Sequence, residues 1–395
     1  MRRGIRGLIQ IIATVIVILS SVLYFLYISD KVSFRILSIG DINPYGGWSA
    51  LKSTFTDVSY RWGGITRSIA LTVSIAITTL FFGRFFCGWI CPVGALQDGI
   101  RFLAGKSGIT NKKLPSKALA RPELLKYVVL IIIIVLSANG AGSRISAFSP
   151  WLAYLNIFTG FRIHTGLIVL ALISLTSLFF SRIFCRCFCP LGAFQALLNA
   201  ISPLKISKGK NCNGCYLCLK DCPVDIIPDG EKTISPECIN CLKCTEVSCI
   251  KGSPGYQVTF GGRAIRNKTY LRTSLLIFLV LFLMLPLSRN YKSAQGTMDL
   301  GQLNDGIYQG LGVGFGGNMV IITTIEENKI IGIEVINHRE TQGYYEEVFK
   351  TMSKEIIETQ NLNIDAISGA TITSRGFLSG VKSGVGMAMD NDSDV

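Results

Sequence analysis

Five apolar runs constrain the fold of this chain more than any other feature of its sequence. They cover residues 8–28, 69–86, 124–137, 166–184 and 274–287. A helix needs about 20 apolar residues to cross the hydrocarbon core of a bilayer, and the third and fifth runs approach that length only with their flanking turns. Only 16% of the residues are charged and the mean hydropathy is +0.44, which excludes a disordered chain. The sequence therefore predicts a polytopic α-helical membrane protein with about five spans.

The first apolar run has the flanks of a membrane anchor. It follows Arg2, Arg3 and Arg6 and ends in Tyr-Phe-Leu-Tyr-Ile at position 28. A secretory signal peptide has a shorter apolar core and ends in small residues at its cleavage site. We therefore expect this run to stay in the protein as an uncleaved span.

Charge is divided unequally along the chain, and this division predicts the orientation. Residues 1–289 carry 32 Lys and Arg against 11 Asp and Glu, whereas residues 290–395 carry 7 against 14. Lys and Arg gather in the cytoplasmic loops of membrane proteins. We expect a multi-pass protein of the cell (inner or plasma) membrane, with the N-terminus and residues 205–270 in the cytoplasm and residues 290–395 outside. Topology then explains the basic charge, and no nucleic-acid partner is expected.

Eight cysteines between positions 212 and 249 have the spacing of a ferredoxin with two [4Fe–4S] clusters. In that pattern three closely spaced thiolates hold one cluster and the fourth cysteine holds the other. This predicts one cluster on Cys212, Cys215, Cys218 and Cys249, and a second on Cys238, Cys241, Cys244 and Cys222. Structural zinc pairs its cysteines differently, and disulfides rarely persist in the cytoplasm. Cys249 departs from the pattern, because four residues rather than three separate it from Cys244 and no proline follows it.

A string that runs from Arg84 to Gln97 recurs from Arg182 to Gln195. Each copy contains a Cys-x-x-x-Cys-Pro motif, formed by Cys87 and Cys91 and by Cys185 and Cys189. Helical residues four apart share a face, and the proline favours a helix break at the second cysteine. We expect the four thiolates to converge on a further iron–sulfur centre. The alternative is that they are buried cysteines acting as small apolar residues. Cys187 has no counterpart in the first copy and stays unassigned.

The chain becomes typical of a soluble α+β domain from residue 304. Residues 307–314, 319–325 and 330–336 are predicted strands, followed by a helix over residues 345–359 and a last helix ending near residue 389. A Ser-Gly-Ala-Thr turn precedes the last helix. A helix N-terminus is suited to bind a phosphate, although Ser, Thr and Gly strings are also common helix caps.

Residues 304–389 resemble the FMN-binding domain of NosR and of the RnfG and NqrC subunits. The resemblance rests on Asp365, Ser368, Gly369, Ala370 and Thr371. It implies that an FMN transferase esterifies FMN through its phosphate onto Thr371.

The string from Asn337 to Gly343 resembles a stretch that lies near the flavin in the same family. That resemblance implies flavin contacts for His338, Glu340 and Thr341. The alternative for His338 is a cap at the end of a strand.

The two Cys-x-x-x-Cys-Pro copies and the ferredoxin-like segment together resemble the NosR and NapH membrane iron–sulfur proteins. In NosR the flavin domain precedes the membrane part, whereas here it follows. Together with the orientation expected from the Lys and Arg distribution, the resemblance predicts a ferredoxin-like cytoplasmic insert and a small α+β extracytoplasmic FMN-binding domain. We expect a membrane domain over residues 1–204, a ferredoxin-like segment over 205–262, the last transmembrane helix over 263–290, a linker over 291–303, the FMN-binding domain over 304–389 and a tail over 390–395.

These modules predict transmembrane electron transport. We expect electrons to pass from a cytoplasmic donor, namely a ferredoxin, a flavodoxin or a flavoprotein, through the clusters to FMN and an extracytoplasmic acceptor. No general base or nucleophile is required, because the cofactors carry the chemistry. Two alternatives remain: a NapH-like quinol dehydrogenase that feeds an outer reductase, and a NosR-like redox sensor or maturation factor.

Overall fold

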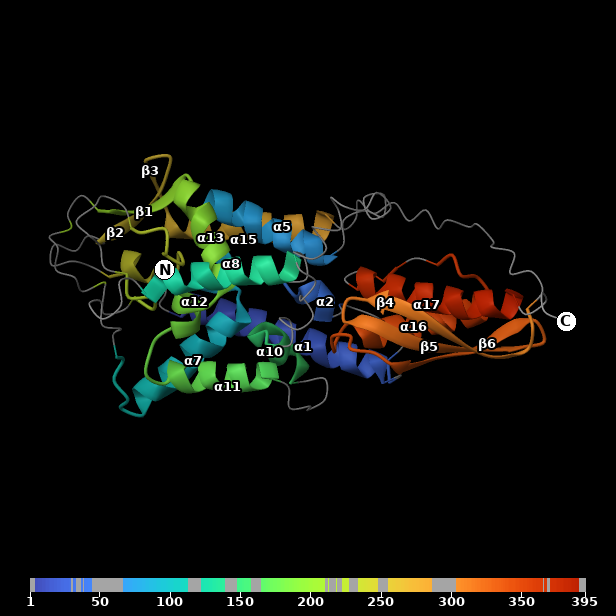
Figure 1. Ribbon diagram of the computed structural model, residues 1–395. Helices are drawn as coiled ribbons and strands as arrows, with labels where there is room; N and C mark the ends of the chain where they lie inside the picture. The colour runs from blue at the N-terminus through green and yellow to red at the C-terminus, as the bar shows by residue number, and fades with distance from the viewer. Residues whose placement is uncertain are drawn as a thin grey trace. The chain divides into compact units, whose positions relative to one another are not determined.

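The computed structural model divides the chain into two compact units (Figure 1). The first unit contains Met1–Leu19, Leu71–Ala138 and Ile163–Met284, and the second contains Ser20–Ala70, Asn139–Arg162 and Leu285–Val395. The residues that the structure describes are 4–29, 31–32, 37, 39–44, 67–112, 122–138, 148–157, 165–209, 212, 218, 222–226, 234–247, 255–285, 303–364, 366–367 and 370–390.

Among the described residues, two helices are long and apolar enough to cross a membrane unbroken. These are α1 (Ile5–Ile28) and α15 (Asn267–Met284), which contain the first and most of the fifth predicted run. The second run begins in α5 (Arg67–Phe82), which forms a pair bent by 100° with the segment Phe85–Lys106.

The third and fourth apolar runs form shorter helices, α8 (Leu125–Ala138) and α11 (Thr165–Ser177), of 14 and 13 residues. A helix rises about 1.5 Å per residue, so neither crosses about 30 Å of hydrocarbon alone. The structure therefore shows apolar helices that fit a membrane protein, and the five predicted spans are not confirmed.

Both copies of the repeat contain two helix breaks rather than the single predicted one. The expected break is present, because Cys91 and Cys189 cap α7 (Pro92–Lys106) and α13 (Pro190–Ile201) with proline in the first turn. An earlier break leaves the first cysteine of each copy in a five-residue helix, α6 (Phe85–Trp89) or α12 (Ile183–Cys187). Because the predicted break lies at the second cysteine, the two cysteines of each pair do not share one continuous helix.

The ferredoxin-like segment begins and ends in one antiparallel sheet. Strand β1 (Leu204–Lys208) pairs with β2 (Tyr256–Phe260), and β2 pairs with β3 (Arg263–Ile265). Leu204 and Val258 of this sheet are buried in a cluster that includes Phe85 and Trp89 of α6. The first unit thus joins both ends of the segment to the cysteine repeat.

The other short elements among the described residues are α2 (Ile39–Ile42), α10 (Pro150–Asn156) and the 3₁₀ turns η1 (Pro122–Leu124) and η2 (Lys243–Thr245).

The C-terminal domain, residues 303–390, has the predicted strands and helices. Strands β4 (Gly306–Gly314), β5 (Gly317–Glu326) and β6 (Lys329–Asn337) form an antiparallel sheet in sequence order. Helices α16 (Tyr345–Thr359) and α17 (Thr371–Asp390) pack on this sheet, as Figure 1 shows. Alternate residues of β5 are buried under the helices, which is the period of a sheet with one covered face.

Glycines bring α17 into backbone contact with β4. A Cβ atom at Gly310 would lie 1.8 Å from the carbonyl oxygen of Gly380, and one at Gly312 would lie 1.9 Å from that of Gly376. Side chains at these positions would force the helix off the sheet. The contact also fixes the direction of α17, whose first turn lies at the end of β4 near Gly314.

The contact predicts a stability effect for Gly310→Ala. The added methyl group overlaps the Gly380 carbonyl, and overpacking of this kind costs about 1–3 kcal/mol. Gly386→Ala is the matched control, because no atom lies within 4 Å of a Cβ there; it should stabilise the helix by about 0.4–1 kcal/mol. Pulse proteolysis of the full chain would measure both changes. Equal stability of the two variants would contradict the backbone contact.

Candidate iron–sulfur centres and flavin site

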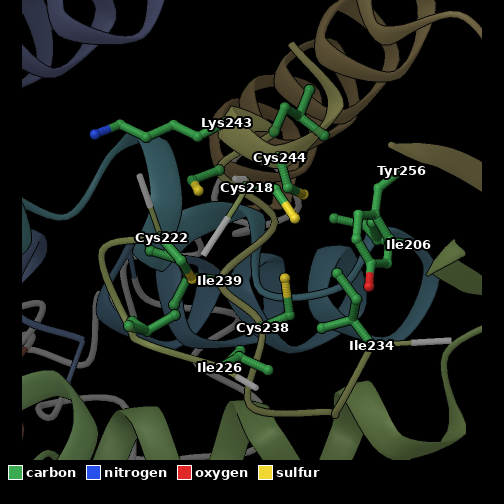
Figure 2. A pocket seen from close by; sticks show the side chains of 13 residues that line it. Ile206, Cys218, Cys222, Ile226, Ile234, Cys238, Ile239, Lys243, Cys244 and Tyr256 are labelled. Carbon is green, nitrogen blue, oxygen red and sulfur yellow. The ribbon is translucent and has the colours of Figure 1, made fainter. Parts of the chain in front are cut away.

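One pocket of the first unit is lined by five cysteines. Figure 2 shows the sulfur atoms of Cys218, Cys238 and Cys244 turned into the cavity. Its other lining residues are Cys222, Cys241, Ile206, Val224, Ile226, Ile234, Ile239, Leu242, Lys243 and Tyr256. The structure therefore brings Cys222 to Cys238, Cys241 and Cys244, with Cys218 beside them. Cys212 does not line this pocket, and Cys215 and Cys249 lie outside the described residues.

The thiols of this pocket need positive charge to ionise. Burial and then the neighbouring Cys241 raise the pKa of Cys222 to about 11. Burial and neighbouring sulfur atoms also raise the pKa of Cys238 and of Cys244 well above the ordinary value. A bound metal supplies that charge, since a coordinating thiol is deprotonated outright.

No three His, Cys, Asp or Glu side chains in the described part of the chain form a group that could hold a single metal ion. Iron–sulfur clusters take cysteine thiolates as ligands, and five cysteines line this pocket. The donor set of this pocket fits an iron–sulfur cluster.

The repeat cysteines lie in a second site, in which each copy supports the other. Gln97 of the first copy donates Nε2 to Cys185 Sγ at 3.3 Å, and Cys87 Sγ lies 3.3 Å from Gln195 Oε1 of the second copy. Cys91 interacts electrostatically with Cys87, Cys185 and Cys189. The structure therefore brings the four cysteines together.

Two buried arginines, Arg84 and Arg182, each contact a glycine of the other copy. A Cβ at Gly94 would lie 3.2 Å from Arg182 Nη2, and one at Gly192 would lie 3.0 Å from Arg84 Nη2. Each arginine is only 1% exposed and interacts electrostatically with the repeat cysteines.

Each arginine also has a carboxylate partner. Arg182 donates Nε and Nη2 to Asp98 at 2.9 and 2.7 Å, and Asp98 also pairs with Arg6 of α1. Arg84 Nη1 lies 3.0 Å from Glu237 Oε2. Each carboxylate is shared with a second cation, Arg6 or Lys126, so each pairing leaves a net positive charge beside the repeat cysteines.

Two buried donors at this site have no acceptor among the described residues, Arg84 Nε and Gln195 Nε2. The oxygen and nitrogen of a glutamine amide exchange places on rotation, so Gln195 has an N–H to donate to a Cys87 thiolate. Unpaired donors beside four cysteines fit a site for thiolates and the sulfides of a cluster. Cys187 is buried in α12, and nothing in the described structure assigns it a ligand role.

The predicted flavin attachment residue, Thr371, is the first residue of α17, directly after Ala370. Asp365, Ser368 and Gly369 lie outside the described residues. The free backbone N–H groups of a helix N-terminus favour a phosphate group. The position of Thr371 therefore fits a phosphoester-linked FMN.

Glu340 is buried and joins three parts of the flavin domain. Its Oε1 accepts from the backbone N–H of Gly316 at 2.8 Å, and its Oε2 accepts from Thr373 Oγ1 at 2.5 Å. The backbone carbonyl of Thr341 accepts from the N–H of Tyr344 at 3.2 Å, in the turn before α16. These bonds hold the loop after β6 against the first turn of α17.

His338 lies at the end of β6, where its ring packs on aromatic side chains. The ring centroid lies 4.3 Å from that of Tyr345 and 5.0 Å from that of Phe349, and Nδ1 accepts from the N–H of Glu340 at 3.3 Å. Burial lowers the pKa of His338, against an opposing effect of Glu340. His338 therefore has a structural role at the strand end, and its flavin contact stays a prediction.

Several residues of these sites were not predicted from the sequence. The arginines and glutamines stand at the two ends of the repeated string, which was a signal that they act with its cysteines. Thr373 follows Thr371 by two residues but has no motif of its own. Asp98 and Glu237 carry no sequence signal, because their partners are distant in the chain.

Family profiles match both kinds of site. A profile described as an FMN-binding domain matches residues 314–386. A profile described as a 4Fe-4S binding domain matches residues 65–110 and 163–209, which contain the two copies of the repeat.

Known proteins are similar over the same regions. The uncharacterized protein MJ0750 of Methanocaldococcus jannaschii is 32% identical over 249 residues, which is 62% of this chain and 96% of that protein. The regulatory protein NosR of Stutzerimonas stutzeri is 32% identical over 181 residues, 44% of this chain and 25% of NosR. The ferredoxin-type protein NapH of Haemophilus influenzae is 29% identical over 206 residues, 46% of this chain and 67% of NapH.

The apolar helices, the cysteine sites and the flavin domain define a membrane iron–sulfur flavoprotein concerned with electron transport. The chain belongs to the family that includes MJ0750. It is a membrane iron–sulfur protein of the NosR/NapH type and carries an FMN-binding domain.

The bond between Glu340 and Thr373 predicts the effect of Thr373→Val. The isosteric change leaves one buried carboxylate oxygen without its donor, at a cost of about 1–3 kcal/mol. Thr359→Val on exposed α16 is the matched control and should change stability by less than about 0.5 kcal/mol. Thermal unfolding of this domain within the full-length protein, monitored by proteolysis, would compare the two variants. A Thr373→Val variant as stable as the control would show that Glu340 does not depend on this bond.

Proposed function

We propose that this protein carries electrons across a membrane, from a cytoplasmic donor to an acceptor outside. The observation that supports this most is that one chain combines two convergent sets of cysteines with an FMN-binding domain. Bound clusters and FMN would supply the electron-carrying chemistry. The chain's own residues hold these groups, bury them and balance their charge.

The ferredoxin-like segment holds two [4Fe–4S] clusters in this proposal. The pocket that joins Cys222 to Cys238, Cys241 and Cys244 supports the exchange of the fourth cysteine between the two sets. Cys212, Cys215, Cys218 and Cys249 then form the other set.

The four repeat cysteines hold a third iron–sulfur centre. The family profile for a 4Fe-4S binding domain covers these residues, which supports metal ligation over a structural role. Arg84 and Arg182 offset the negative charge of four thiolates, and Gln97 and Gln195 supply N–H donors to them. This site provides the relay that a membrane of about 30 Å requires.

FMN is attached covalently to Thr371 by an FMN transferase. The start of α17 supports this, because the N-terminal N–H groups would bind the phosphate that links FMN to the hydroxyl. His338, Glu340 and Thr341 would lie near the flavin.

The membrane domain crosses the bilayer about five times, with the ferredoxin-like segment inside and the flavin domain outside. The uneven distribution of Lys and Arg supports this orientation. The shorter α8 and α11 would span with their flanking residues. A basic inner surface favours an acidic donor such as a ferredoxin or flavodoxin by electrostatic steering.

The covalent flavin predicts a fluorescent band for this protein on a denaturing gel. Wild type made in a host with the transferase should fluoresce, and Thr371→Ala should lose the band because the attacking hydroxyl is gone. Thr359→Ala in the same domain should keep it. A fluorescent Thr371→Ala protein would place the attachment elsewhere, and a dark wild type would remove the flavin end of the path.

Vesicles would test electron transport itself. Protein in vesicles that enclose ferricyanide should oxidise a reduced ferredoxin added outside, and Thr371→Ala should slow this at least about tenfold. Wild-type protein without steady turnover would indicate a redox sensor. Electrons that enter only from a quinol would indicate a quinol dehydrogenase.

The third centre predicts the iron content of a variant with Cys87, Cys91, Cys185 and Cys189 all changed to Ser. It should keep about eight iron atoms per chain, the content of two [4Fe–4S] clusters, while wild type holds more. Cys187→Ser is the matched control, because Cys187 is equally buried between two of these cysteines. Equal iron in wild type and the fourfold variant would exclude the third centre.

A further inference from the structure

One loop of the ferredoxin-like segment, residues 236–241, contacts the first copy of the cysteine repeat. Trp89 Nε1 of α6 donates to the carbonyl of Asn240 at 2.9 Å. A Cβ atom at position 88 would lie 2.3 Å from the carbonyl oxygen of Ile239. Gly88 is therefore required for the two backbones to approach this closely.

A buried ion-pair network holds the same loop. Arg84 Nη1 donates to the backbone oxygen of Glu237 at 2.9 Å and to its Oε2 at 3.0 Å. Lys126 pairs with the same oxygen, and Tyr127 donates to Oε1 at 2.7 Å. The contacts of Glu237 thus fix the backbone directly before Cys238.

The second copy of the repeat contacts the same set of cysteines. Asn199 of α13 donates to the carbonyls of Pro236 and Cys238 at 2.7 and 3.4 Å. Arg186 of α12 donates to Asp225 at 2.8 Å, three residues after Cys222. Both copies therefore hold the stretches that carry Cys222 and Cys238.

One buried apolar cluster contains sulfur from both sites. Cys87 of the repeat packs with Cys241, Val224, Ile226 and Ile239 of the ferredoxin-like segment, and Cys222 and Cys238 lie at its edge. Electron tunnelling weakens steeply with distance. The close backbone approach at Gly88 and the packing of Cys87 with Cys241 therefore favour exchange at this point.

We propose that the site formed by Cys222, Cys238, Cys241 and Cys244 exchanges electrons directly with the site formed by the four repeat cysteines. In this order the Cys212 site receives electrons first, from the cytoplasmic donor. This order rests on the proposed electron transport. One electron leaves one site and enters the other: the first is oxidised and the second reduced by one electron, and no bond or proton changes. Arg84 and Glu237 act as positioning residues at this junction.

Gly88→Val in the full-length protein tests the junction. Electron paramagnetic resonance with redox titration would record the reduced signals, which Cys238→Ser and Cys212→Ser variants assign to the two ferredoxin-type sites. We expect Gly88→Val to shift the g values and midpoint potential of the Cys238 signal and to leave the Cys212 signal unchanged. Gly99→Val in α7, two residues after the same repeat copy, is the matched control, because no atom lies within 4 Å of a Cβ there. A shift confined to the Cys212 signal, or no shift, would overturn the proposal.

Glu237→Gln decides the question if Gly88→Val loses its iron. Removal of one negative charge beside Cys238 should raise the midpoint potential of the Cys238 signal alone. Glu358→Gln, which removes the same charge from the exposed face of α16, should change neither signal. A larger change in the Cys212 signal would overturn the assigned order.

The fourfold serine variant separates this proposal from the proposed function. Reduction of the repeat site should speed the spin relaxation of the Cys238 signal in wild type, and the variant should lose this effect. Faster relaxation of the Cys212 signal instead would overturn the order while leaving a third centre in place. Unchanged iron content in the variant would exclude the relay, whereas the Gly88→Val result would still report the contact.

Discussion

Buried guanidinium charge is the constraint on which the first unit depends. Arg84 and Arg182 are almost fully buried, and an unpaired buried charge costs about 3–5 kcal/mol. Each therefore requires a carboxylate at a fixed place. Asp98 pairs with Arg182 and also with Arg6 of α1. Glu237 pairs with Arg84 and so connects the ferredoxin-like segment to the repeat. The same two charges that face the repeat cysteines thus determine what packs around them.

The sequence predicted the features that depend on local spacing. Cysteine intervals indicated the ferredoxin-type sets, and alternating apolar residues placed β4, β5 and β6 within two residues of their observed ends. The repeated string indicated that Cys87, Cys91, Cys185 and Cys189 act together. Each of these signals lies within one short stretch, where the periods of strands and motifs are strong.

Contacts between distant stretches were not predicted. Gln97 and Gln195 each bond to a cysteine of the other copy, and these bonds form only when the helices are packed. The same is true of the ion pairs of Asp98 and Glu237. The break before each first cysteine was missed because the apolar pattern continues through it. Gly83 and Arg182, both with positive φ, lie in the breaks before α6 and α12, which divide the predicted runs into shorter helices.

The reciprocal support between the two copies has a consequence for biogenesis. A nascent chain that has emerged only as far as the first motif possesses two of the four thiols and neither the glutamine nor the arginine that covers them from the second copy. The pocket is then incomplete and open. If this site holds the proposed third centre, its metal can be loaded only after the second motif has been synthesised, and a chain truncated between the copies would have only half of the thiol ligands there.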